Sequence, residues 1–105
     1  MKDRFLSTLG ICRKAGKLLW GFDVVARAAA DGDAVLVLLA RDLSPKSEKE
    51  IRFTLEKHGI GIRNTPVTMD EIWYRVGKRS GILAVTDPGL AHTIEQALIR
   101  MNEED

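Results

Sequence analysis

The chain has 105 residues, of which 45% are hydrophobic and 30% are charged, and its formal net charge is +1. This length and composition predict one globular domain over residues 1–105, with enough apolar residues to form its own core. No apolar run approaches the ~20 residues that cross a bilayer, and the N-terminus has no signal-peptide pattern. We therefore expect a cytoplasmic protein without a membrane partner. The single cysteine, Cys12, excludes an internal disulfide bond and a multi-cysteine metal site.

The charges are unevenly distributed along the chain. Residues 1–27 contain six bases and two acids, a local net charge of +4, and residues 75–79 add three bases without an acid. The last four residues, 102–105, are mostly acidic, and we expect them to be frayed. A basic area on a nearly neutral protein fits a surface that contacts RNA, although an ordinary solvated surface explains the same pattern.

The first half of the chain alternates between helical and strand patterns. Apolar spacing predicts a helix at about 2–15, a short strand at 18–20, a helix at 22–31 and an apolar strand at 35–40. The strand at 35–40 has no polar residue, so both of its faces should be covered and it should be central in the sheet. The second helix is expected to bury four small or branched residues, Val24, Val25, Ala28 and Ala29.

The second half of the chain continues the alternation. The pattern predicts a helix at about 45–58, a strand near 60–64, a helix at 69–76, a strand at 82–86 and a helix at 88–101. Helix starts are indicated at Ser44-Pro45, at the capping-box pattern from Thr68 to Glu71, and at Asp87-Pro88. Helix ends are indicated by Gly16, Gly32, Gly59 and Gly77. The order of elements predicts an α/β protein, a three-layer α/β/α sandwich with a mixed, largely parallel sheet of about four strands.

The residue types that usually carry catalysis are few. His58 at a helix end and His92 on the last helix fit structural or surface roles, and Cys12 has the spacing of a buried hydrophobe. Asp87 is better explained as a helix cap than as a catalytic acid. No residues have metal-ligand spacing, and there is no glycine-rich phosphate loop. We therefore expect a protein that is not an enzyme and that has no metal and no cofactor.

The two tryptophans are candidates for stacking on nucleic-acid bases. Trp73 has the spacing of a core face together with Ile72 and Val76, so we expect it to be buried. Trp20 ends a short strand at the edge of the pattern, and both a structural role and a role in base stacking remain open.

The start of the second helix is the best candidate for a binding edge, because open α/β sheets bind ligands where strands end and helices begin. Gly21 allows close approach of the backbone, and the helix N-terminus offers free N–H groups to a phosphate. Asp23 and Arg27 lie four residues apart on one helix face. They form either a surface ion pair worth ~0.3–0.5 kcal/mol, or contacts to a base and a phosphate.

Three segments of the chain resemble the kink-turn-binding ribosomal protein family of the L-seven-Ae type, and especially its small bacterial members. They are Cys-Arg-Lys-Ala-Gly-Lys-Leu-Leu-Trp-Gly at 12–21, Leu-Val-Leu-Leu-Ala-Arg-Asp-Leu-Ser-Pro at 36–45, and Leu-Ala-Val-Thr-Asp-Pro-Gly-Leu-Ala at 83–91. The resemblance extends over nearly the whole chain. It implies the α/β/α sandwich, structured RNA as the partner, and ribosomal proteins as further partners within a ribonucleoprotein.

The family reads tandem sheared G·A pairs with a Gly-x-Asn-Glu-x-x-Lys motif, which corresponds here to residues 21–27. Asp23 replaces the Asn, Val24 replaces the Glu and Arg27 replaces the Lys. The family's second contact, an apolar loop, corresponds to the basic segment 77–81. These replacements imply RNA binding with more backbone contact and stronger dependence on salt. The implied RNA-binding residues are Lys14, Lys17, Gly21, Phe22, Asp23, Arg27, Arg41, Lys78, Arg79 and Ser80.

The sequence therefore favours a non-enzymatic RNA-binding protein that is ribosome-associated or binds structured, kink-turn-like RNA. The alternative is a protein-interaction module on the same fold that has lost specific RNA binding, and Val24 is the residue that favours it. A nucleotide-binding or small-molecule enzyme is the third hypothesis, and the missing catalytic residues weigh against it.

Overall fold

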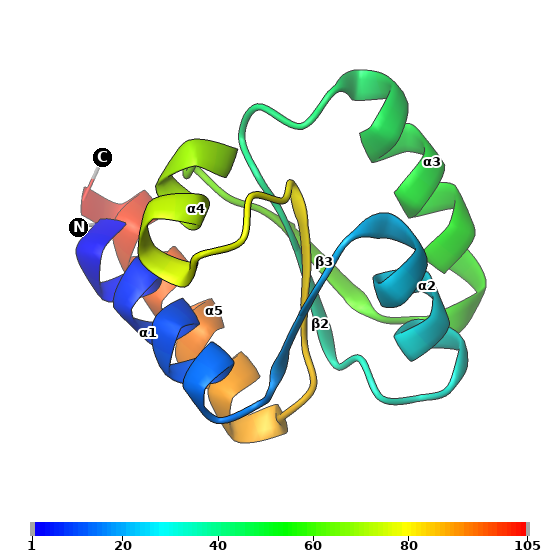
Figure 1. Ribbon diagram of the computed structural model, residues 1–105, viewed down its shortest axis with the longest axis horizontal. Helices are drawn as coiled ribbons and strands as arrows, with labels where there is room; N and C mark the ends of the chain where they lie inside the picture. The colour runs from blue at the N-terminus through cyan, green and yellow to red at the C-terminus, as the bar shows by residue number, and fades with distance from the viewer. Residues whose placement is uncertain (1, 105) are drawn as a thin grey trace.

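The computed structural model describes residues 2–104, which form two helical layers around one sheet (Figure 1). The elements are α1 (Lys2–Lys14), β1 (Leu18–Trp20), α2 (Phe22–Ala30), β2 (Leu36–Leu39), α3 (Pro45–Leu55), η1 (Glu56–His58), β3 (Gly61–Asn64), α4 (Met69–Val76), β4 (Ile82–Val85) and α5 (Pro88–Glu104). Most ends lie within one residue of the predicted ones. The third helix changes to 3-10 geometry after Leu55. The last helix continues to Glu104, three residues beyond its predicted end, and Asp105 lies outside the described residues.

The four strands form one mixed sheet in the order β1-β4-β2-β3. β2 and β3 pair in parallel, whereas β4 is antiparallel to both β1 and β2. β1, β2 and β3 thus run in the same direction. β4 lies between β1 and β2 and runs in the opposite direction, so both of its pairings are antiparallel. The prediction of a mixed four-stranded sheet is confirmed, and the prediction of a largely parallel sheet is corrected to one parallel pairing out of three.

Each face of the sheet packs against its own helical layer, which confirms the α/β/α sandwich. Along β2, Leu36 and Leu38 point into the core under α1, α4 and α5, whereas Val37 and Leu39 point into the core under α2 and α3. This alternation is the period of two expected for a strand covered on both faces. Within residues 2–104, no helix is both long and apolar enough to cross a membrane.

The predicted helix caps are present. The Ser44 hydroxyl accepts a hydrogen bond from the Ser47 N–H at 3.1 Å, and Thr68 and Glu71 form the reciprocal capping box of α4. The Asp87 carboxylate accepts from the Leu90 N–H at 2.8 Å, so it caps α5. The four glycines predicted at helix ends all have positive φ angles. Local capping chemistry therefore marks the starts of α3, α4 and α5.

Two apolar residues that were predicted to be buried are exposed. Val24 is 49% exposed and Trp73 is 55% exposed. Each short helix buries only a narrow stripe, Val25, Ala28 and Ala29 on α2 and Ile72 and Val76 on α4. A neighbouring position is rotated by about 100° around the helix axis and leaves that stripe. Both side chains are consequently part of the surface.

Candidate nucleic-acid interface

Three chain segments meet at one end of the sheet. Trp20 at the end of β1 lies opposite Leu83, and Leu39 at the end of β2 lies opposite Ile82. The Gly21 N–H donates to the Ile82 carbonyl at 3.0 Å, and the Ala40 N–H donates to the Gly81 carbonyl at 2.9 Å. The start of α2, the end of β2 and the loop 77–81 therefore form one surface, which we call the sheet end.

Gly21 joins β1 to α2 in a conformation that favours glycine, with φ 99° and ψ 148°. It is the N-cap of α2, and no side chain caps this terminus. The N–H groups in the first turn of a helix have no acceptor within the helix, so they are available to an anionic ligand. A Cβ at Gly21 would meet no atom within 4 Å, so the requirement for glycine comes from the backbone rather than from packing.

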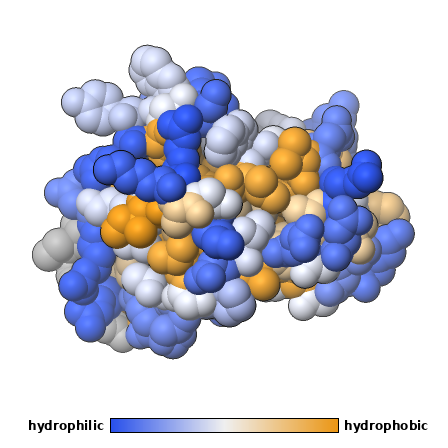
Figure 2. Space-filling view, turned by 60° about the horizontal axis from the view of Figure 1, so that its bottom comes forward, coloured by the Kyte–Doolittle hydropathy of each residue, from blue (hydrophilic) through white to orange (hydrophobic). Residues whose placement is uncertain are grey.

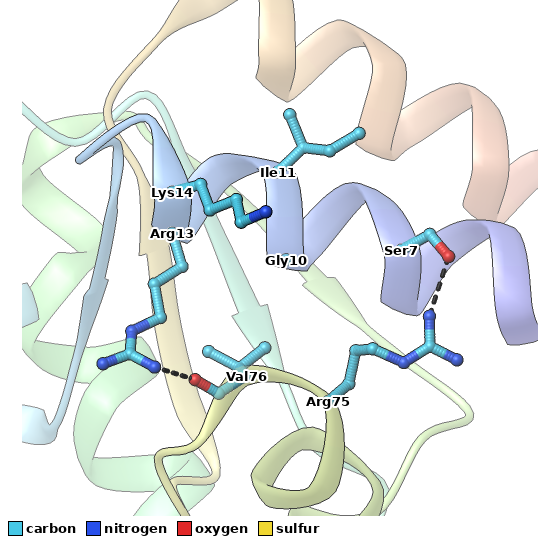
Figure 3. A pocket seen from close by; sticks show the side chains of 7 residues that line it. All are labelled: Ser7, Gly10, Ile11, Arg13, Lys14, Arg75 and Val76. Atoms are coloured by element: carbon cyan, nitrogen blue, oxygen red, sulfur yellow. Dashed lines mark hydrogen bonds between the residues drawn. The ribbon is translucent and has the colours of Figure 1, made fainter.

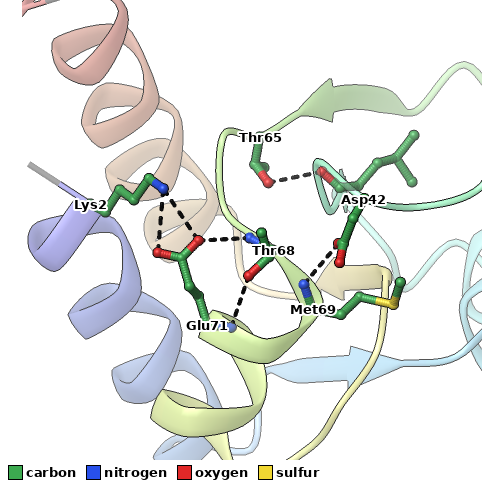
Figure 4. A network of polar contacts seen from close by, with 7 residues as sticks. Lys2, Asp42, Thr65, Thr68, Met69 and Glu71 are labelled. Atoms are coloured by element: carbon green, nitrogen blue, oxygen red, sulfur yellow. Dashed lines mark hydrogen bonds and ion pairs between the residues drawn. The ribbon is translucent and has the colours of Figure 1, made fainter.

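Arg41 is held at the sheet end by its backbone. Its N–H donates to the Val67 carbonyl at 2.7 Å. The next residue, Asp42, accepts a hydrogen bond from the Met69 N–H at 2.9 Å, which ties this loop to the start of α4 (Figure 4). The side chain of Arg41 is exposed, and among residues 2–104 it has no ion-pair partner. Its guanidinium is therefore available to an external anion, on a loop that is hydrogen-bonded to the start of α4.

The basic loop 77–81 contributes Lys78, whereas the next two residues, Arg79 and Ser80, form contacts within the protein. The Lys78 Nζ lies 5.5 Å from the centroid of the Trp20 ring, within the range of a cation–π contact. The Arg79 Nε lies 2.9 Å from Asp70 Oδ1, an exposed ion pair. The Ser80 hydroxyl donates to the Ile82 carbonyl at 2.9 Å and accepts from the Ile82 N–H at 3.2 Å. Ser80 thus shapes the loop.

Arg13 was not among the predicted binding residues, yet it belongs to this surface. Its guanidinium donates to the Val76 carbonyl and lies 5.7 Å from the centroid of the Trp20 ring. Trp20 is therefore flanked by two cations, Arg13 and Lys78. A Cβ at Gly77 would lie 2.8 Å from Nη1 of Arg13, so this glycine leaves room for the guanidinium. The sequence signal was only that Arg13 is one of the bases in the N-terminal segment.

Asp23 and Arg27 do not form an ion pair with each other, which was one of the two alternatives for them. The Arg27 Nε instead lies 3.5 Å from Asp31 Oδ2, and both side chains are largely exposed. Such exposed pairs contribute ~0.2–1 kcal/mol, so Asp31 restrains Arg27 only weakly. Asp23, Asp31, Asp33 and Arg27 share a shallow cavity of about 460 Å³ with three apolar residues, Leu19, Val24 and Ala28. This surface, which we call the acidic face, carries more negative than positive charge.

Lys14 and Lys17 lie away from the sheet end. The Lys17 carbonyl accepts from the Thr86 N–H at 3.0 Å, which places Lys17 at the opposite end of β1. Gly21 is four positions further along this extended segment, about 13 Å away. Lys14 lines a groove between α1 and α4 (Figure 3). The structure therefore brings Gly21, Phe22, Asp23, Arg41 and the loop 78–80 together at the sheet end, but not the two lysines; Arg27 lies one turn along α2.

The residue types associated with catalysis are dispersed. Cys12 is fully buried, and burial raises the pKa of its thiol, with the Asp87 carboxylate raising it further. His58 ends the 3-10 turn, and His92 is exposed on α5. Within residues 2–104, no three His, Cys, Asp or Glu side chains gather where they could hold a metal ion.

Exposed apolar side chains accompany the charged ones. Figure 2 shows hydrophobic residues gathered across the middle of one face, with hydrophilic residues on both sides. The large exposed hydrophobic residues are Ile11, Val24, Val35, Phe53, Trp73, Tyr74 and Ile99. They come from several helices and from one loop, so they do not form a single stripe of the kind that marks one helix partner.

The chain matches no protein-family model and no curated protein. It is similar to solved structures. A protein of unknown function from Bacillus halodurans is 26% identical, with a TM-score of 0.81, over 92% of this chain and 97% of that one. The 15.5 kDa RNA-binding protein of Giardia lamblia is 11% identical, with a TM-score of 0.73, over 97% of this chain and 88% of that one. The second likeness concerns the fold alone.

Proposed function

We propose that this protein is a non-enzymatic RNA-binding protein that binds structured RNA at the sheet end, in a ribosome-associated or other ribonucleoprotein setting. The observation that carries the proposal is the meeting of three features on one surface. They are the uncapped N-terminus of α2 at Gly21, the unpaired guanidinium of Arg41, and Lys78 beside Trp20. Backbone N–H groups and cations bind phosphates, and the partly buried indole ring of Trp20 holds the Lys78 ammonium at this surface.

The likeness in fold to the RNA-binding protein of Giardia lamblia supports the same reading. The resemblance of residues 21–27 to the kink-turn motif adds the class of RNA. The two positions that would read the sheared G·A pairs hold Asp23 and Val24. Val24 cannot form a hydrogen bond, and each good pair to a base edge provides ~1–3 kcal/mol of discrimination. Phosphate contacts therefore carry most of the affinity in this proposal, and kink-turn selectivity is reduced.

A second candidate function is protein interaction through the acidic face. Val24 is half exposed beside Leu19 and is surrounded by Asp23, Asp31 and Asp33. Such a surface suits a basic peptide with an apolar side chain better than it suits RNA, because the three carboxylates repel phosphates.

A binding titration separates the two candidates. A fluorescent kink-turn RNA, and the same RNA with its G·A pairs replaced by Watson–Crick pairs, are titrated with the protein between ~50 and ~200 mM salt. The proposal expects binding of both RNAs, with affinity that falls steeply with salt and depends on Arg41 and Lys78. If neither RNA binds at the lowest salt, the RNA-binding proposal is refuted and the protein-interaction function is left.

A further inference from the structure

A second basic surface lies outside the sheet end, in the groove between α1 and α4 (Figure 3). The groove encloses about 550 Å³, within the size range of ligand sites. Its charged lining residues are Arg13, Lys14 and Arg75, without a carboxylate. The Arg75 Nη1 donates to the Ser7 hydroxyl at 2.7 Å, which fixes the guanidinium against α1. Asp3 lies 3.6 Å from Arg75, and its side chain is 96% exposed.

Gly10 has no structural explanation. It lies within α1, where glycine costs roughly 1 kcal/mol relative to alanine. A Cβ at this position would meet no atom within 4 Å, so packing does not require a glycine here. The missing side chain keeps the floor of the groove open. In Figure 3 the Lys14 side chain extends back along α1, so that its ammonium lies near Gly10 rather than beyond the helix end.

An exposed aromatic residue stands at the rim. Tyr74 is 87% exposed and lines a second hollow between α1 and α4, which shares Arg75 with the groove. The acids of this hollow, Asp3, Asp70 and Glu71, are each ion-paired, with Arg75, Arg79 and Lys2, so its charges are balanced. An aromatic ring near cations is the arrangement that binds single-stranded nucleic acid. Each unpaired nucleobase can stack on the ring while the phosphates contact the lysine and arginine side chains.

The groove is also continuous with the sheet end. Arg13 lines the groove, and its guanidinium lies over Trp20, which Lys78 flanks at the sheet end. A nucleic-acid strand that leaves the sheet end therefore passes from Lys78 and Trp20 to Arg13 and into the groove without crossing an acidic surface.

We infer that the α1–α4 groove binds a single-stranded segment of the same RNA, with phosphates on Lys14, Arg13 and Arg75 over Gly10 and with a base stacked on Tyr74. This inference rests on the proposed RNA-binding function, because the groove extends the surface that begins at the sheet end.

The test compares two RNAs, a blunt kink-turn hairpin and the same hairpin with a tail of uridines. The tail should increase the affinity of the wild-type protein about five- to tenfold. Tyr74→Ala should remove this increase and leave the affinity for the blunt hairpin unchanged. Phe53→Ala is the matched control, because Phe53 is 77% exposed on α3, away from the groove. Lys14→Glu should also remove the increase, whereas Lys57→Glu at the far end of the α3–η1 segment should not.

Gly10→Ala provides a second readout. It should raise the melting temperature, because alanine favours the helix, and it should reduce the increase in affinity that the tail provides. A higher melting temperature with an unchanged tail increase would overturn the inference. The inference would also be overturned if the tail still increased the affinity of the Tyr74→Ala and Lys14→Glu variants. If Arg41→Glu abolished binding of both RNAs in the same experiments, the proposed function would remain intact.

A free oligouridylate distinguishes failure at the groove from failure at the sheet end. If the blunt hairpin does not bind at low salt, the proposed function fails. If the wild-type protein then still binds the oligouridylate and Lys14→Glu abolishes this binding, the result would support the groove as a site for single-stranded RNA. Absence of oligouridylate binding by the wild-type protein at low salt would overturn the groove as a site for single-stranded RNA.

Discussion

The acidic face on α2 and the basic surface formed by Arg13, Lys14, Arg75 and Lys78 differ in charge on a chain whose formal net charge is only +1. On the acidic face, three carboxylates surround one arginine, and that arginine is paired with Asp31. On the basic surface, the cations line a groove and flank a tryptophan. A near-neutral net charge therefore conceals a separation of charge, and a polyanion has one preferred side.

The largest expected effect comes from reversing charge at the sheet end. Arg41→Glu combined with Lys78→Glu should weaken RNA binding about a hundredfold and lower the salt slope by about two, because two phosphate contacts are lost. Arg27→Glu should have a smaller effect, since Arg27 lies on the acidic face and is already paired. Anisotropy titrations at several salt concentrations measure both quantities. Equal effects of Arg27 and Arg41 would contradict the preference for the basic side.

The next effect tests how Arg13 is held. Gly77→Ala should destabilise the fold by about 2 kcal/mol, through the positive φ of 84° and the displacement of the Arg13 guanidinium from Val76. Gly16→Ala is the matched control, because its φ is 71° and its Cβ would meet open space. Gly16→Ala should lower the free energy of unfolding by about 1 kcal/mol. Urea unfolding of the two variants gives the comparison, and equal losses would mean that the Arg13 contact contributes nothing.

A charge-neutral change on α2 sharpens the comparison. Asp23→Asn combined with Val24→Glu restores the Asn-Glu pair of the kink-turn motif without changing the net charge. We expect selectivity for the kink-turn RNA over its base-paired variant to rise about tenfold, because both side chains can then hydrogen-bond to base edges. An unchanged ratio of the two affinities would mean that α2 does not face the G·A pairs.

The smallest effect concerns the contact between α1 and α4. The Thr68 N–H donates to the Glu71 carboxylate and lowers its pKa, and Lys2 contributes further, with 3.3 Å between its Nζ and Glu71 Oε1 (Figure 4). Because the pKa is lowered in the folded state, the stabilisation is present above the ordinary value of 4.5 and is lost as the pH falls below it.

Glu71→Gln should therefore cost about 0.5 kcal/mol at neutral pH, since the group is partly exposed and solvent screens the interaction. The difference from the wild-type protein should vanish in acid. Thermal unfolding at pH 7 and pH 3 measures it, and a difference that persists at pH 3 would assign the loss to packing instead.

The sequence predicted those features that depend on local chemistry. The apolar run in β2 identified the central strand, and Ser44, Thr68 and Asp87 identified three helix starts. The position of Gly21 and Arg41 at one sheet end followed from strands that run in the same direction. These predictions succeeded because caps and two-sided burial leave a signal within a few neighbouring residues.

Features that depend on contacts through space were not predictable. β4 inserts between β1 and β2, and nothing in its apolar sequence specifies that place. Arg27 has an aspartate four residues away on either side, and the structure pairs it with Asp31 although the opposite order is favoured in isolated helices. Arg13 lies near the end of α1 and Trp20 at the end of β1, and no spacing pattern within either element relates them. Only the folded turn between α1 and β1 brings them together. The same turn sends Lys17 to the opposite end of β1.

The most direct test of the central claim is an amide chemical-shift titration of the wild-type protein with the blunt kink-turn hairpin. If RNA binds at the sheet end, the largest shifts should appear at Gly21, Arg41 and Lys78, with little change at Ala26 and Phe53 on the α2–α3 side. Shifts confined to the α2–α3 side, or the absence of shifts at low salt, would contradict the account.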